Sequence, residues 1–112
     1  MKIIETSGNL DKRQIYKFTN GKNLVKLSEC DGRQFDIESY VIYTDVNTKT
    51  NEEQELLAFA TSDGDIITTN SATAMRSFRA MLEAFETVPL TDVIVVSGQS
   101  RNGRTYYDLD IV

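Results

Sequence analysis

The segment from Ser71 to Phe85 constrains the fold more than any other stretch of this sequence. Its apolar side chains recur at the spacing of a single helix face, at Met75, Phe78, Met81, Leu82 and Phe85. Asn70 and Ser71 are suited to cap the first N–H groups of a helix, and Pro89 cannot continue one. We therefore predict a helix over this segment, with an apolar stripe that must pack against a sheet.

Extended segments flank this helix on both sides. Apolar residues that alternate or run together predict strands over residues 33–46, 55–61, 66–69, 92–97 and 104–112. Asp63-Gly64 and Asn102-Gly103 are typical of tight hairpin turns, which favour antiparallel pairing. Three strands, a helix and two further strands form the order of the OB-fold, a partly open barrel. We predict a mainly β, OB-fold-like five-stranded antiparallel barrel, with an α+β sandwich of the same order as the alternative.

Residues 1–30 are expected to form an N-terminal extension of a single domain that spans residues 1–112. Within the extension, residues 11–18 have the pattern of a short helix that turns Ile15 and Phe18 inward. Residues 23–29 alternate like a short strand or an extended arm.

The long strand over residues 33–46 carries apolar groups on both faces. Strict alternation places Tyr40 and Ile42 on one face, and the other face holds Phe35, Ile37, Val41 and Tyr43. Since Tyr40 and Tyr43 point to opposite faces, we expect at most one of them to line a groove. The sequence does not decide between them.

The final hairpin allows a residue-by-residue prediction. A two-residue turn at Asn102-Gly103 would set Arg101 opposite Arg104. The same register would pair Val96 with Leu109 and Ile94 with Ile111 as the core face. Two guanidinium groups facing each other repel by a few tenths of a kcal/mol in water, and a bound anion would relieve that repulsion.

Composition excludes several classes of function. The chain has no histidine and a single cysteine, Cys30, which excludes Cys/His zinc sites and histidine-based triads. Carboxylates such as Asp36, Glu38 and Asp45 have no spacing that suggests a catalytic site, so we expect no enzyme, no metal and no cofactor.

One cysteine cannot form an internal disulfide, and no run approaches the roughly 20 apolar residues of a membrane span. We expect a cytoplasmic protein without a membrane partner.

The formal net charge of −5 is unevenly distributed. Residues 11–27 carry five basic residues against Asp11, for a local charge of +4. Residues 28–65 carry ten acids against Arg33 and Lys49, for a local charge of −8. Since salt screens charges beyond about 10 Å, the basic segment is able to bind phosphate groups in spite of the acidic segment.

Binding of single-stranded nucleic acid requires cations that follow the phosphates and aromatic faces that stack on bases. The sequence places such groups at the tip of the last hairpin, on the long strand, in the loop that follows it, and in the basic segment. The candidate binding residues are Arg101, Arg104, Tyr106, Tyr40, Tyr43, Lys49, Lys12, Arg13, Tyr16, Lys17, Lys22 and Lys26.

Two stretches resemble small phage-encoded single-stranded-DNA-binding proteins. They are residues 64–82 (GDIITTNSATAMRSFRAML) and residues 97–111 (SGQSRNGRTYYDLDI), with weaker similarity over residues 15–27 and 40–45. The resemblance covers about the C-terminal half of the chain, and implies an OB-type fold that coats replicating DNA. An acidic C-terminal tail, which recruits partners in larger bacterial relatives, is not separable here, because Asp108 and Asp110 belong to the expected final strand.

The sequence thus predicts non-catalytic, largely sequence-independent binding of single-stranded DNA in phage replication or recombination, in the host cytoplasm. RNA as the ligand, a homodimer and a replication-protein partner are left open. The alternative is an acidic protein-binding module, or a DNA mimic that inhibits a host nucleic-acid enzyme through residues 28–65.

Overall fold

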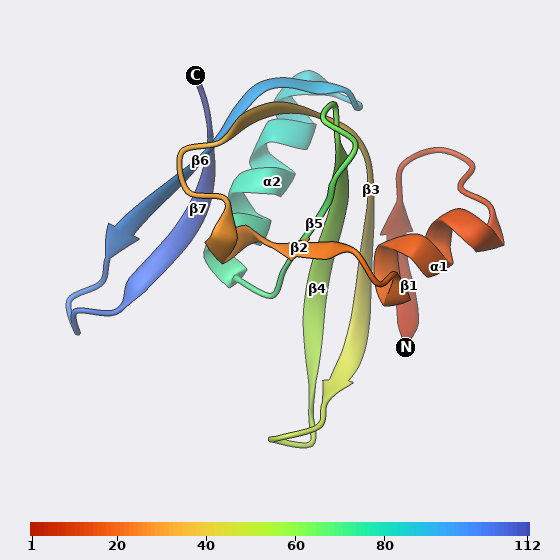
Figure 1. The fold of residues 1–112 in the computed structure, drawn as a ribbon, viewed down its shortest axis with the longest axis horizontal. Helices are drawn as coiled ribbons and strands as arrows, with labels where there is room; N and C mark the ends of the chain where they lie inside the picture. The colour runs from red at the N-terminus through yellow and green to blue at the C-terminus, as the bar shows by residue number, and fades with distance from the viewer.

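A computed structural model describes all residues, 1–112, as one curled sheet with a helix on each side (Figure 1). The secondary structure is mainly β. The elements are, in chain order, β1 (Lys2–Thr6), α1 (Lys12–Asn20), β2 (Leu24–Lys26), the 3-10 helix η1 (Leu27–Glu29), β3 (Gln34–Asn47), β4 (Glu52–Thr61), β5 (Ile66–Thr69), α2 (Ala72–Phe85), β6 (Leu90–Gln99) and β7 (Thr105–Ile111).

The strand β3 organises the sheet, because it pairs antiparallel with β4, β6 and β1. The order across the sheet is β2-β5-β4-β3-β6-β7, with β1 as an additional neighbour of β3. From β3 onward the order is three strands, one helix and two strands, as the sequence predicts. The sheet nevertheless has seven strands and not five, because the N-terminal segment contributes β1 and β2. One pair is also parallel, since β2 runs alongside β5.

The helix α2 fills the inside of the curled sheet, which is open on one side like half a barrel (Figure 1). Ser71 caps its first turn by accepting a hydrogen bond from the N–H of Ala74, 3.2 Å away. Met75, Phe78 and Met81 are buried in the main core, while Phe85 at the end of the stripe is 37% exposed. The predicted helix and its apolar face are therefore confirmed, except that the stripe reaches the surface at its last turn.

The helix α1 covers the opposite face of the same sheet. Phe18, which is 4% exposed, packs with Val41, Tyr43 and Ala58 in a second buried cluster. The N-cap residue of this helix is Asp11, whose carboxylate accepts a hydrogen bond from the N–H of Gln14. The central strands β3 and β4 are consequently buried on both faces, and the N-terminal segment is part of the core.

A β-bulge in β3 changes the predicted faces of that strand. Pairing with β4 shifts by one residue between Ile37 and Ser39, so Glu38 is an extra residue. Beyond the bulge the alternation is reversed. Ile37 and Tyr40 therefore belong to the same main core, while Tyr43 belongs to the cluster under α1. Strict alternation, which grouped Ile37 with Tyr43, is wrong because it does not allow for an inserted residue.

The last hairpin also differs from the predicted register. Val95 pairs with Leu109 and Val93 with Ile111, one residue away from the predicted pairs. The cause is the loop, since the backbone N–H of Ser100 bonds the carbonyl of Arg104 and leaves three residues, 101–103, in the turn. A shift of one residue exchanges the two faces of a strand. Val93 and Val95 thus lie in the core, where Val96 and Ile94 were expected.

Candidate nucleic-acid interface

The tip of the β6–β7 hairpin is a three-residue loop with exposed cations. Gly103 has φ of +76°, a left-handed conformation that glycine adopts without steric cost, and its N–H bonds the carbonyl of Ser100. Arg101 lies in the turn and Arg104 opposite Ser100, so the two guanidinium groups do not form the predicted facing pair. Both arginines are exposed and neither forms an ion pair.

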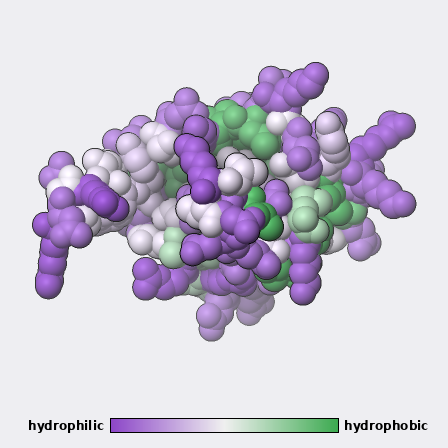
Figure 2. All heavy atoms as spheres, turned by 90° about the horizontal axis from the view of Figure 1, so that it is seen from below, coloured by the Kyte–Doolittle hydropathy of each residue, from purple (hydrophilic) through white to green (hydrophobic).

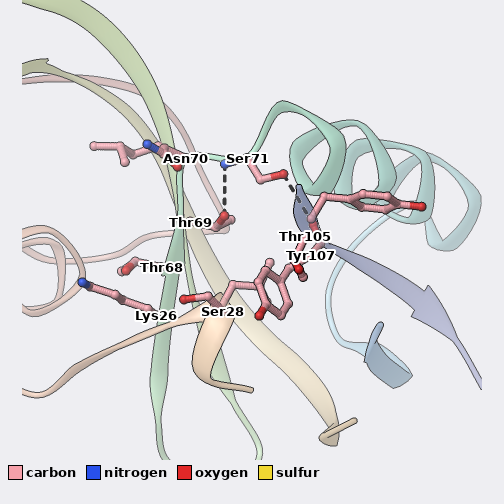
Figure 3. Close-up of a pocket in the computed structure, with 11 residues that line it drawn as sticks. Lys26, Ser28, Thr68, Thr69, Asn70, Ser71, Thr105 and Tyr107 are labelled. Carbon is pink, nitrogen blue, oxygen red and sulfur yellow. Dashed lines mark hydrogen bonds between the residues drawn. The ribbon is translucent and has the colours of Figure 1, made fainter. Parts of the chain in front are cut away.

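A polar cleft of about 540 Å³ lies beside this hairpin (Figure 3). One wall comes from the end of β2 and from η1, with Lys26 and Ser28, and another comes from the start of β7. The end of β5 and the start of α2 close the cleft, and Figure 3 shows Thr69, Asn70 and Ser71 at this end. The complete lining consists of Lys26, Leu27, Ser28, Leu56, Thr68, Thr69, Asn70, Ser71, Thr105, Tyr106 and Tyr107.

Internal hydrogen bonds occupy part of the polar lining. The hydroxyl of Thr69 accepts from the N–H of Ser71, and the hydroxyl of Ser71 donates to the carbonyl of Tyr107 at 3.5 Å. The Lys26 side chain makes no ion pair, although the Glu29 carboxylate accepts from the Lys26 backbone N–H. One ammonium group and several hydroxyl groups therefore remain for a polar or anionic ligand.

A second hollow lies at the other end of β2. Its lining includes Lys17 from the end of α1 and Lys22 from the turn before β2, together with the carboxyl-bearing Asp65. Lys17, Lys22 and Lys26 are all exposed and free of ion pairs, so cations follow the length of β2 from one hollow to the other. Of the twelve lysine and arginine residues, only Arg33 and Arg79 pair with a side-chain carboxylate.

The outer side of α1 carries the remaining predicted basic residues. Lys12, Arg13 and Lys17 are exposed on this helix, and Tyr16 between them is 60% exposed. The predicted interleaving of cations with an aromatic residue is therefore present at the surface.

Tyr40 and Tyr43 cannot line a groove, because both are buried. The ring of Tyr40 packs edge-on against Phe78 with centroids 4.9 Å apart, and its hydroxyl donates to Glu5. Burial and this hydrogen bond raise the pKa of Tyr40 to about 12. Tyr43 lies under α1 with Phe18, and burial together with the nearby Asp45 raises its pKa. The expectation was that at most one of the two lines a groove, and neither does, since each face of β3 is covered by a helix. Both therefore leave the set of candidate binding residues.

Lys49 lies at the tip of the β3–β4 hairpin in acidic surroundings. The exposed carboxylates of Asp45, Glu52 and Glu53 belong to the same hairpin. Figure 2 views the molecule from the side of this tip and shows mostly hydrophilic side chains, with apolar atoms in small patches between them. Lys49 is thus one cation among several acids, and it does not line the cleft that Lys26 lines.

The Asp63-Gly64 turn is held by an arginine. The guanidinium of Arg33 bonds Asp63 at 3.1 Å and Asp65 at 3.0 Å, and it also reaches the sulfur of Cys30 at 3.7 Å. Burial raises the pKa of the Cys30 thiol, an effect that the hydrogen bond from Arg33 opposes. Arg33 thus connects Cys30, at the end of η1, to the β4–β5 turn, and we assign these contacts a structural role.

Comparison of the chain with known protein families, with characterised proteins and with solved structures found no match. None of the helices has the length and apolar character that a membrane crossing requires.

Proposed function

We propose that this chain is a single-stranded-DNA-binding protein of OB type that acts without catalysis, in phage DNA replication or recombination in the host cytoplasm. The observation that carries the proposal is the line of unpaired cations beside an aromatic residue. Tyr106 lies at one side of the polar cleft, with the exposed Arg104 two residues before it in the chain. Lys26 lies at the other side, and Lys22 and Lys17 continue along β2.

The order of the elements supports the OB-type assignment. In an OB-fold the helix lies between the third and fourth strands, and the first–second and fourth–fifth loops frame the ligand groove. The corresponding loops here are the tips of the β3–β4 and β6–β7 hairpins, which both project toward the lower side of Figure 1. The polar cleft uses the start of β7 and the neighbouring ends of β5 and β2.

Single-stranded DNA suits this surface better than a duplex. Its phosphates would follow the cations, and an unstacked base would be free to meet Tyr106, which is 42% exposed. A duplex has no free base face for such a contact.

The salt dependence has a calculable size. Five phosphate contacts, one for each of Lys17, Lys22, Lys26, Arg101 and Arg104, would give a slope of about −3.5 in a plot of log affinity against log salt. Between about 50 and 200 mM salt the affinity would then fall roughly a hundredfold. The acids of the β3–β4 hairpin reduce the attraction most at low salt, where screening is weak.

The test is a titration of a fluorescently labelled oligo-dT of roughly 16 nucleotides, with a duplex of equal length as the control. Fluorescence anisotropy at the two salt concentrations should show tight, salt-sensitive binding to the single strand and much weaker binding to the duplex. Equal binding to both, or no binding to either at low salt, would contradict the proposal.

A second candidate function rests on the β3–β4 hairpin. Its exposed acids, Asp45, Glu52 and Glu53, form a negative projection that would suit a basic protein partner or imitate DNA. A pull-down from host lysate separates the two candidates. One stoichiometric protein that is lost when Glu52 and Glu53 are replaced by glutamine would favour this function over DNA binding.

A further inference from the structure

The ring of Tyr106 lies directly over the backbone of Gly98. The two residues are paired across β6 and β7. A Cβ atom added at Gly98 would be 2.5 Å from the Tyr106 hydroxyl oxygen, 2.6 Å from Cζ and 3.0 Å from Cε1. Such distances are too short for any side chain, so the ring occupies the space that every other residue type would fill.

Gly98 is not needed for its backbone conformation. The glycines with positive φ are Gly8, Gly32, Gly64 and Gly103, and Gly98 is not among them. Alanine would thus fit the backbone of β6 at this position. The missing side chain serves only to let the ring of Tyr106 approach the strand, a use of glycine that often marks close contact in a sheet.

The Tyr106 ring contacts Gly98 and is also partly exposed to solvent. Tyr106 is 42% exposed and lines the polar cleft, whereas the next residue, Tyr107, packs partly buried against the main core. Asp108 shares its face of β7, and the exposed Arg104 directly precedes the strand. The Asp108 carboxylate accepts a hydrogen bond from the N–H of Leu109 at 2.8 Å, so it is engaged with its own strand.

We propose that Gly98 positions Tyr106 as a fixed stacking platform for one unpaired base, an inference that rests on the single-strand binding proposed above. Contact with Gly98 restricts the ring before the ligand arrives, which lowers the entropy lost on binding. Arg104, which is exposed and lies two residues before Tyr106 in the chain, would meet the phosphate next to the stacked base. The platform accepts any base with a free ring face, and excludes bases within a duplex.

The decisive variant is Gly98→Ala, compared with Tyr106→Ala and with the double variant. The added methyl group meets the far end of a side chain, so the ring must move while the strand remains. We expect each single variant to bind oligo-dT roughly tenfold more weakly than the unmodified chain, the size of one lost base stack. The double variant should bind oligo-dT no more weakly than Tyr106→Ala alone, because Gly98 affects binding only through the Tyr106 ring.

Two further measurements make the platform testable even if Gly98→Ala does not fold. Tyr106→Phe keeps the stacking face and should retain the affinity, but should lose much of the tyrosine fluorescence quenching that stacking causes, a signal that is readable because the chain has no tryptophan. An abasic strand of equal length offers phosphates without bases. The unmodified chain should prefer oligo-dT to this strand, and Tyr106→Ala should lose most of that preference.

The outcomes distinguish failure of the stacking platform from failure of the proposed function. If the unmodified protein does not bind single strands, both the proposed function and the platform are refuted. Unmodified protein that binds, with Gly98→Ala or Tyr106→Ala binding equally well, refutes the platform alone. Additive losses in the double variant also refute it, because they would show that Gly98 affects binding by another route.

Discussion

Replacing Phe18 with alanine tests whether the N-terminal helix is part of the folded core. Phe18 is 4% exposed and packs against Val41, Tyr43 and Ala58 on the outer face of the sheet. Truncation of a buried phenylalanine to alanine typically costs about 3–5 kcal/mol, through lost burial and the cavity that remains. A helix of nine residues is too short to be stable in isolation, so weaker docking should also loosen α1 itself.

We expect Phe18→Ala to lower the free energy of unfolding by about 3 kcal/mol, near the lower end of that range, because α1 is able to move into the space. For a chain of this size the change corresponds to a fall in Tm of roughly 12 °C. Urea unfolding followed by far-UV circular dichroism measures the free energy directly. Hydrogen exchange should show faster exchange in α1 than in α2.

Tyr16→Ala is the matched control, because Tyr16 is an aromatic residue on the same helix and is 60% exposed. Its loss should change stability by no more than about 0.5 kcal/mol, as is usual for surface positions. If Phe18→Ala costs less than about 1 kcal/mol, α1 is not docked on β3 and β4. In that case the N-terminal segment is a true extension, as the sequence predicts.

Three further predictions concern the surface and the buried phenol. Replacing Arg101 and Arg104 with alanine should weaken binding to all single-stranded sequences and reduce the salt slope by about 1.4, as measured by anisotropy over a salt series, and an unchanged slope would remove these residues from the interface. Replacing Glu52 and Glu53 with glutamine should strengthen DNA binding a few-fold at about 50 mM salt. A lower affinity would contradict the expectation that these carboxylates repel the DNA phosphates. Because the pKa of Tyr40 is raised to about 12, its contribution to stability is complete below pH 10 and is lost as the pH rises through 12. Absorbance titration near 295 nm should show a tyrosine hydroxyl that ionises near pH 12 and that is absent in Tyr40→Phe. Ionisation of Tyr40 near pH 10 would contradict its burial.

Local patterns in the sequence were sufficient to locate most elements of the fold. The apolar stripe from Met75 to Met81, the cap at Ser71 and the turn at Gly64 each depend on residues close to one another in the chain. The order of strands and helix from residue 34 onward follows from these signals. The exposed cations and Tyr106 were also identified, since unpaired basic residues near a turn are visible in the sequence itself.

Tertiary pairing decided the features on which the site depends. Which face of β3 holds Tyr40 is set by a single inserted residue, Glu38, and the register of β6 and β7 by one additional residue in the turn. No local preference encodes such a shift, because each alternative register also gives apolar pairs. The contact between Gly98 and Tyr106 could be found only from that register. The sequence by itself determined the elements and the chemical groups they carry, whereas the pairing of distant strands decided which groups are buried and which remain available to a ligand.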